Sequence, residues 1–315
     1  MPPVFMGASS SLFNVCTVLK KHRSLVLPLA IVVGFCLHGA LAELKPVVPF
    51  LLFFILLLNF SSVEIRKLRI TALHLWMLLF QILLSLFGYL AVARFDSLLA
   101  QGVLIGALMP VASSVVVISC MLGADRATIT TYSMVGNLGI ALAAPVFFSF
   151  IGQHVDMPFW ESVLLILSKI APTLILPFVL VILMQLFLPK ANDWIARYKG
   201  VSFYLWAMAL MITIGQTIHF IFVSGKGNEL QILWLSVVSL LLCVVQFAVG
   251  KAMGARFGDR VSGGQGLGQR NTALAIWMAG MYLHPLTTIV PAAYSVWQNL
   301  FNSLQLWLHD RREKK

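Results

Sequence analysis

The sequence predicts an all-α membrane protein with ten transmembrane helices, and three observations lead to that prediction. Of the 315 residues, 60% are hydrophobic and only 10% are charged, whereas an average soluble chain has about 25% charged residues. The apolar residues form long runs separated by short basic or Gly/Pro-containing breaks, and the basic residues gather at alternate breaks. A water-soluble fold is therefore excluded. Nucleic acid is not an expected partner, because no basic stripe is interleaved with aromatic residues.

Ten apolar runs meet or approach the length of about 20 residues that a membrane-spanning helix needs. The expected spans are 24–41, 47–64, 72–93, 99–122, 127–151, 160–187, 200–222, 230–252, 263–283 and 286–308. The first run is expected to stay in the mature protein, because no small-residue cleavage site follows it cleanly.

The distribution of Lys and Arg predicts the orientation of these spans. With ten crossings, alternate loops share a side of the membrane, and 17 basic residues fall on one side against Lys45, Arg94 and Lys226 on the other. Cytoplasmic loops carry an excess of Lys and Arg. We therefore expect an integral protein of the plasma or inner membrane with both termini in the cytoplasm.

Ten spans divide into two sets of five, and an odd number of spans per set gives the second set the opposite orientation. Such inverted repeats are typical of secondary transporters. The expected units are a cytoplasmic segment 1–23, a first repeat 24–151, a second, inverted repeat 160–308 and a basic cytoplasmic tail 309–315.

The fourth span of each set is the one most interrupted by helix-weakening residues. The first holds Met109–Ser114, which includes Pro110, and the second opens with the Gly-rich stretch Gly263–Thr272. Pro removes a backbone donor, and each Gly lowers helix propensity by about 1 kcal/mol. A proline kink or Gly-mediated packing is the alternative interpretation of either segment alone. Their matching positions favour a substrate site.

The expected membrane interior holds two cations and no carboxylate, because all eleven acidic residues fall at span ends or in loops. A buried cation costs about 2.5–3.5 kcal/mol on insertion scales, so polar groups have to meet Arg270 and Lys169. Arg270 either donates to carbonyls freed by the broken fourth helix or holds an anionic substrate by bidentate hydrogen bonds. Lys169 has either a structural, water-facing role or a role in substrate or proton coupling.

The last two spans resemble the bile acid:sodium symporter family. The resemblance lies in Asn271-Thr-Ala-Leu-Ala and in the stretch from His284 to Leu300, with its Ser-Val-Trp-Gln-Asn. Gln81, Pro110–Ser114 and Leu174–Pro177 are similar to family segments as well. The resemblance implies a ten-span carrier with a panel domain and a core domain, in which the fourth and ninth helices are broken and cross.

The departures from that family concern its sodium sites. Sodium-coupled members have a Glu five residues before the Asn of the ninth helix and a Gln directly before it, where this chain has Gly266 and Arg270. Ser114 stands at the position of a family Asn, and Asn137 lies where fifth-helix ligands fall. The comparison implies that sodium does not bind through the usual sites, and that Arg270 supplies the fixed positive charge instead.

The sequence thus predicts a secondary active transporter of a small or amphipathic organic anion that works by alternating access. The candidate substrate-binding residues are Gln81, Ser113, Ser114, Asn137, Gln269, Arg270, Asn271 and Thr272, with Lys169 as a candidate coupling residue. No metal site, cofactor or enzymatic activity is expected, because the His and Cys residues lack metal spacing and no catalytic set stands out. A non-transporting membrane receptor or sensor with the same fold is the alternative.

Overall fold

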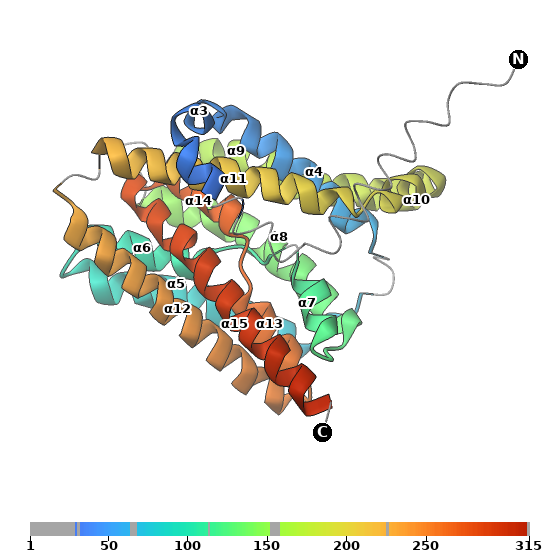
Figure 1. Ribbon diagram of the computed structural model, residues 1–315. Helices are drawn as coiled ribbons and strands as arrows, with labels where there is room; N and C mark the ends of the chain where they lie inside the picture. Colours follow the sequence, from blue (N-terminus) through green and yellow to red (C-terminus); the bar gives the residue numbers. More distant parts are fainter. Residues whose placement is uncertain are drawn as a thin grey trace, which may run out of the picture.

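The computed structural model is all-helical and describes residues 29, 32–63, 68–112, 114–151, 158–224 and 227–313 (Figure 1). Its elements are α3 (His38–Glu43), η1 (Lys45–Val47), α4 (Val48–Ser61), α5 (Ala72–Ala93), α6 (Ser97–Leu108), α7 (Val115–Met121), α8 (Arg126–Ile151), α9 (Phe159–Phe187), α10 (Pro189–Arg197), α11 (Val201–Ser224), α12 (Glu229–Arg256), α13 (Arg260–Gly268), α14 (Thr272–Tyr282), η3 (Pro285–Thr288) and α15 (Ile289–Glu313).

Four helices of the described chain are long and apolar enough to cross a membrane: α5, α8, α11 and α12. Helix α9 makes a fifth if its two arms, which meet at a bend of 50°, form one span. Pro172 and Pro177 lie inside α9 and account for the bend, because each removes a backbone donor and crowds the preceding turn. The chain is therefore a helical membrane protein with several candidate transmembrane helices.

Helix boundaries agree with several of the expected spans. The spans 72–93, 127–151 and 160–187 match α5, α8 and α9 to within one residue. The expected spans 99–122 and 263–283, which the sequence marks as interrupted, are each two helices separated by a short non-helical segment. Much of the expected span 24–41 lies outside the described residues.

The stretch Gly263–Thr272 contains the second break at its C-terminal end. Helix α13 continues through Gly268, so the glycines themselves are helical and only the residues between Gly268 and Thr272 are not. The glycines serve close packing of α13 on α12: a Cβ atom at Gly263 would overlap the carbonyl oxygen of Gly250 and the backbone of Gly254. Small residues that let two backbones approach are a common device at membrane helix interfaces.

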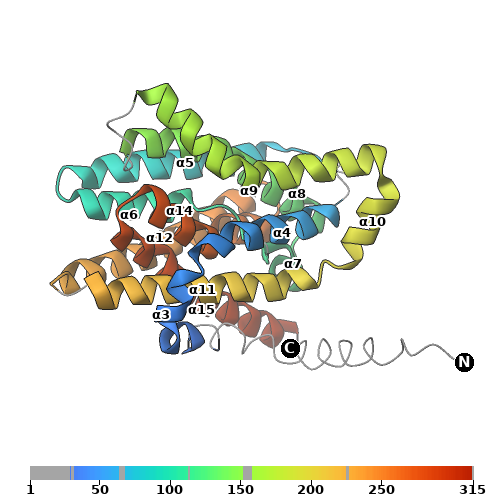
Figure 2. The same ribbon diagram turned by 90° about the horizontal axis from the view of Figure 1, so that it is seen from above.

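The helices pack as two groups that lie side by side (Figures 1 and 2). In the first group, α4 packs against α9 and α11, and α11 packs against α3. The second group contains α5 to α8 and α12 to α15, with α12 in contact with α5, α6, α13 and α15. The two broken helices lie within this second group, so their breaks are surrounded by other helices.

Replacing Gly263 with Ala should destabilise the protein, because the new methyl group has no room between α13 and α12. We expect the free energy of unfolding to fall by about 1–3 kcal/mol, the usual cost of overpacking. Thermal unfolding of the purified protein in detergent measures the effect.

Gly39→Ala is the matched control, because Gly39 is also helical and a Cβ there would meet nothing within 4 Å. This change should be neutral or stabilising, since Ala is favoured over Gly in a helix by about 1 kcal/mol. Equal melting temperatures for the two variants would contradict the packing argument.

Candidate functional site

The two helix breaks pair with each other. Helix α6 ends at Leu108 and α13 ends at Gly268, and the extended residues that follow run antiparallel, with Val111 and Arg270 forming a β-bridge. The Ala112 amide donates to the Gln269 carbonyl at 3.1 Å, and the Asn271 amide donates to the Pro110 carbonyl at 2.8 Å. We call residues 109–112 and 269–272 the crossing segments.

The two broken helices run in opposite directions through this point (Figure 1). Helix α6 contacts α14 on one side of the breaks, and α7 contacts α13 on the other side. Every residue of the crossing segments is buried. Each unpaired backbone group at this depth would cost several kcal/mol in a bilayer, so each needs a partner within the protein.

Two amide side chains from different helices form hydrogen bonds with the backbone of the bridged residues. Asn137 of α8 accepts a hydrogen bond from the Val111 amide through Oδ1 at 2.9 Å. Gln298 of α15 accepts from the Arg270 amide at 2.8 Å and donates to the Arg270 carbonyl at 3.2 Å. The backbone of each bridged residue is thus anchored by the helix that follows its own broken span.

Carbonyls at the ends of α6 and α13 are paired by further side chains. Gln81 of α5 donates through Nε2 to the Met109 carbonyl at 2.7 Å, and Tyr132 donates through its hydroxyl to Gln81 Oε1 at 3.3 Å. Tyr294 of α15 donates to the Gly268 carbonyl at 3.0 Å. These bonds satisfy groups that would otherwise continue a helix.

The Arg270 side chain lies at the centre of the crossing and is only 1% exposed. Its Nε donates to Gln246 Oε1 at 2.8 Å, and its Nη1 donates to the Met109 carbonyl at 3.3 Å. Gln246 of α12 is itself fixed, because its Nε2 donates to the Gly106 carbonyl at 3.1 Å. The second terminal nitrogen, Nη2, has no hydrogen-bond partner among the described residues.

No carboxylate balances this buried charge within the described chain. The carboxylates whose side chains are described are exposed or half-buried, and the hydrogen-bond partners of Arg270 are neutral. The hydroxyls of Tyr132 and Tyr294 lie close to the guanidinium. The negative end of the α6 dipole also faces it, which is favourable for a cation. The site could therefore accept one anionic group on Nη2.

Comparison with known proteins adds no assignment to this geometry. The chain matches no protein-family profile, and no curated protein matches it.

The structure brings six of the predicted site residues together at the crossing. These are Gln81, Asn137, Gln269, Arg270, Asn271 and Thr272, all of them buried. The Gln269 side chain donates to Gln265, and the Asn271 side chain accepts from the Leu274 amide at 3.2 Å, which caps α14.

The remaining predicted residues lie elsewhere or outside the description. Ser114 is half-buried directly before α7, and Ser113 lies outside the described residues. Lys169 belongs to α9, which packs against α4 and α8, and its side chain is not among those described. A functional role for Ser113 and Lys169 therefore stays a prediction.

Sequence reasoning missed four side chains that complete the site: Gln246, Gln298, Tyr132 and Tyr294. The available signal was an isolated Gln inside a long apolar run. A buried amide in a membrane span is rare and has to be partnered, so such a Gln marks a polar contact even where no motif surrounds it.

Gln298→Leu should destabilise the crossing, because it leaves the buried amide of Arg270 unpaired, while the Arg270 carbonyl keeps its hydrogen bond from the Thr272 amide at 3.0 Å. An unsatisfied buried group costs about 1–3 kcal/mol, so the free energy of unfolding should fall by about that amount. Denaturation of the purified protein, followed by circular dichroism, gives the measurement.

Asn302→Leu is the control on the same helix. Asn302 is 4% exposed and its Oδ1 has no partner in the described chain. Replacing Asn302 with Leu should therefore leave the free energy of unfolding unchanged or raise it. The role assigned to Gln298 would be wrong if the two Leu variants unfolded at the same denaturant concentration.

Proposed function

We propose that this protein is a secondary transporter of a small or amphipathic organic anion that works by alternating access. The observation that carries the proposal is the Arg270 guanidinium, which is buried between two paired helix breaks and, within the described part of the chain, has no carboxylate partner and no hydrogen bond from Nη2. Broken helices at matching positions are the usual place of substrate sites in transporters with inverted repeats. The resemblance to the bile acid:sodium symporter family agrees with this assignment.

Contacts around the bridge support two inverted repeats, 24–151 and 160–308. The order of elements α5, α6/α7, α8 recurs as α12, α13/α14, α15, and the two broken helices are antiparallel. Asn137 binds the Val111 amide as Gln298 binds the Arg270 amide. Rotation by half a turn about the bridge therefore exchanges equivalent contacts, with Val111 in the place of Arg270.

The ten-span count extends the four or five candidate spans by the shorter apolar pieces. Lys45–Ser61, α6 and α14 are apolar but too short to span alone. Joined across their breaks, α6 with α7 and α13 with α14 each give one crossing, and η3 with α15 gives another, which makes nine. The tenth is the expected span 24–41, which begins outside the described residues and reaches α3. In this arrangement α3, α4, α9 and α11 correspond to the panel domain that the resemblance implies, and the other long helices correspond to the core domain.

Arg270 serves two purposes in this proposal. Its Nε and Nη1 hold Gln246 and the Met109 carbonyl, which is the structural role expected from the sequence. Its Nη2 remains for one oxygen of the substrate, so the anion is held by a single nitrogen and not by the two-nitrogen fork. The buried crossing segments then belong to a closed state that must open for the substrate to enter.

Sodium is not the coupling ion at the usual site. A Cβ atom at Gly266, where the related family has a Glu, would overlap the Met77 methyl and the Tyr132 ring. An apolar methyl and an aromatic ring fill the place that a carboxylate ligand would need. The charge of Arg270 next to this place would also repel a cation.

The orientation follows from the charge distribution of the loops and can be tested by labelling. In Figures 1 and 2, α10 and the C-terminal end of α15 lie at one end of the helices, while the α5–α6 connection lies at the other end.

In a cysteine-free background, Phe95→Cys, at a position 89% exposed, should react with membrane-impermeant maleimide in intact cells. Ala191→Cys in α10 should not react until the cells are permeabilised.

Both positions are exposed in the structure, so a difference in labelling reports the side of the membrane and not burial. Labelling after permeabilisation is the control for reactivity. Labelling of Ala191→Cys alone in intact cells, or equal labelling of both positions, would overturn the cytoplasmic placement of the termini.

The transport proposal is tested through Arg270. A thermal-shift screen with a monocarboxylate, a dicarboxylate and an amphipathic sulfonate identifies the anion with the largest effect. Titration should show that Arg270→Gln binds that anion about 10- to 100-fold more weakly than wild type, which is the loss expected for one charge-assisted hydrogen bond. Arg270→Lys should lie between them, and Arg256→Gln, an exposed control, should bind as wild type. Affinity should be the same in sodium-free choline buffer.

Melting temperatures decide between binding and structure. If Arg270→Gln kept wild-type affinity while its melting temperature fell, Arg270 would be structural only and the anion site would be wrong. Tenfold weaker binding in choline, restored by sodium, would overturn the sodium argument. Specific binding without flux into proteoliposomes would favour the receptor or sensor alternative.

A further inference from the structure

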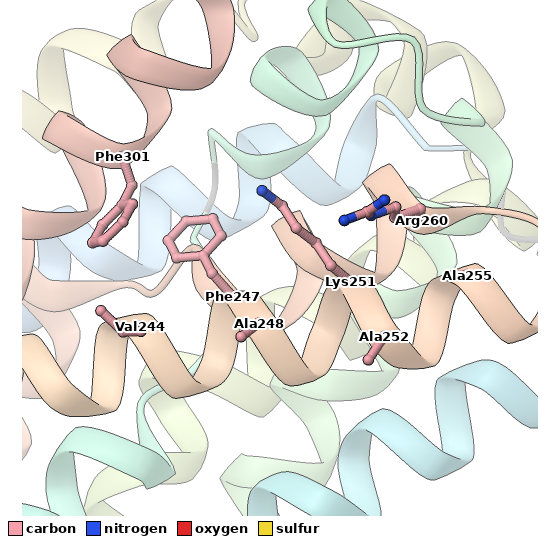
Figure 3. Close-up of a pocket in the computed structure, with 8 residues that line it drawn as sticks. All are labelled: Val244, Phe247, Ala248, Lys251, Ala252, Ala255, Arg260 and Phe301. Carbon is pink, nitrogen blue, oxygen red and sulfur yellow. The ribbon is translucent and has the colours of Figure 1, made fainter. Parts of the chain in front are cut away.

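A groove away from the crossing combines apolar walls with two basic side chains. It has a volume of about 540 Å³ and lies along α12, against α15 and the start of α13 (Figure 3). Its apolar walls are Val244, Phe247, Ala248, Ala252, Ala255 and Phe301. Lys251 and Arg260 lie beside each other at one end.

The basic end of the groove has no anion of its own. No carboxylate lines it, and neither Lys251 nor Arg260 makes a hydrogen bond or an ion pair within the described part of the chain. Asp259, the neighbour of Arg260, is engaged by the Ser262 amide at 2.8 Å at the start of α13. The two cations lie close enough to repel each other, which an anion between them would relieve.

Packing holds Lys251 at this place. Its aliphatic stem lies against Gly264 of α13, where a Cβ atom would overlap it. A second hollow, of about 260 Å³, continues past the same Lys251 and Arg260 to Gln305 and His309 of α15. Polar side chains from three helices, α12, α13 and α15, therefore line the two adjoining hollows.

The exposure of the apolar part fits a position inside one leaflet of a bilayer. From Lys251 back to Val244, α12 rises by about 10 Å, which lies within the thickness of about 15 Å of half the hydrocarbon core. Helix α12 also exposes Leu241 and Val245 beside the groove, so this face is turned toward apolar surroundings. A charged head joined to a hydrocarbon chain has the shape and charge that such a groove accepts.

We propose that this groove binds an anionic glycerophospholipid, with the phosphate between Lys251 and Arg260 and an acyl chain along Ala248 and Val244 toward Phe301. Basic pockets between membrane helices are suited to phospholipid head groups. The site is separate from the proposed substrate site. A lipid bound here joins α12 and α15, which contribute Gln246 and Gln298 to the crossing, and α13, which directly precedes the crossing segment that holds Arg270.

The test is native mass spectrometry of the full-length protein, delipidated in neutral detergent and given equal amounts of phosphatidylglycerol and phosphatidylcholine. Wild type should retain phosphatidylglycerol in preference to phosphatidylcholine. Lys251→Gln combined with Arg260→Gln should lower its retention by about tenfold or more, because each basic residue near an anionic head group adds to binding. Arg256→Gln is exposed and outside the groove, so it should leave retention unchanged.

A second pair of variants tests the acyl chain without changing charge. Ala248→Trp should fill the groove and lower retention of phosphatidylglycerol, while Val245→Trp, next to the groove but not part of its wall, should not. This pair decides the proposal even if the double charge variant does not fold. The lipid proposal would be overturned if wild type retained both lipids equally. It would also be overturned if the two Trp variants retained phosphatidylglycerol equally. The same thermal stabilisation by inorganic phosphate alone as by phosphatidylglycerol would overturn it too, since the acyl chain would then add nothing.

Discussion

Backbone hydrogen bonding inside the bilayer is the constraint from which the rest of this structure follows. A helix broken at membrane depth releases amides and carbonyls that lipid cannot pair. Here two breaks are placed side by side, so that the Ala112 amide meets the Gln269 carbonyl and the Asn271 amide meets the Pro110 carbonyl. The groups left over point away from this short ladder, and side chains of α5, α8 and α15 pair them.

The contacts on the two sides of the β-bridge are similar, except that one bridged residue, Arg270, carries a charge. Its partner in the bridge is Val111, whose side chain needs no polar contact. Gln246 accommodates the difference, because its oxygen accepts from Arg270 while its nitrogen donates to the Gly106 carbonyl of α6. The cation is thus tied to both broken helices, yet within the described residues its Nη2 makes no hydrogen bond. The hydroxyls of Tyr132 and Tyr294 lie near the guanidinium but are neutral, so they do not balance its charge, which is the physical reason for proposing an anion there.

The periodicity and composition of the sequence predicted where the helices lie better than they predicted which side chains contact one another. Long apolar runs predicted α5, α8 and α9 to within a residue, because hydrophobic length is fixed by the bilayer. The interrupted segments Met109–Ser114 and Gly263–Thr272 contain the two breaks, but Gly content did not show that the glycines themselves are helical. Whether a Gly-rich stretch is helical depends on what it packs against, here Gly250 and Gly254 of α12. Gln246 and Gln298 could not be assigned partners, since the register between distant helices is a tertiary property.

The bonds of the crossing also limit how the protein could move. All of the hydrogen bonds described at the crossing segments come from helices of the second group, and none comes from α3, α4, α9 or α11. Opening the crossing itself would break several buried hydrogen bonds at once, at about 1–3 kcal/mol for each group left unpaired. A shift between the two groups would slide the packed faces of α8 against α9 and of α11 against α14, and the hydrogen bond described between the groups is the exposed 3.4 Å bond from Lys45 Nζ to the Gly280 carbonyl. Alternating access, as proposed here, is therefore less costly as a movement of the whole second group, carrying Arg270 with it, than as a rearrangement of the crossing.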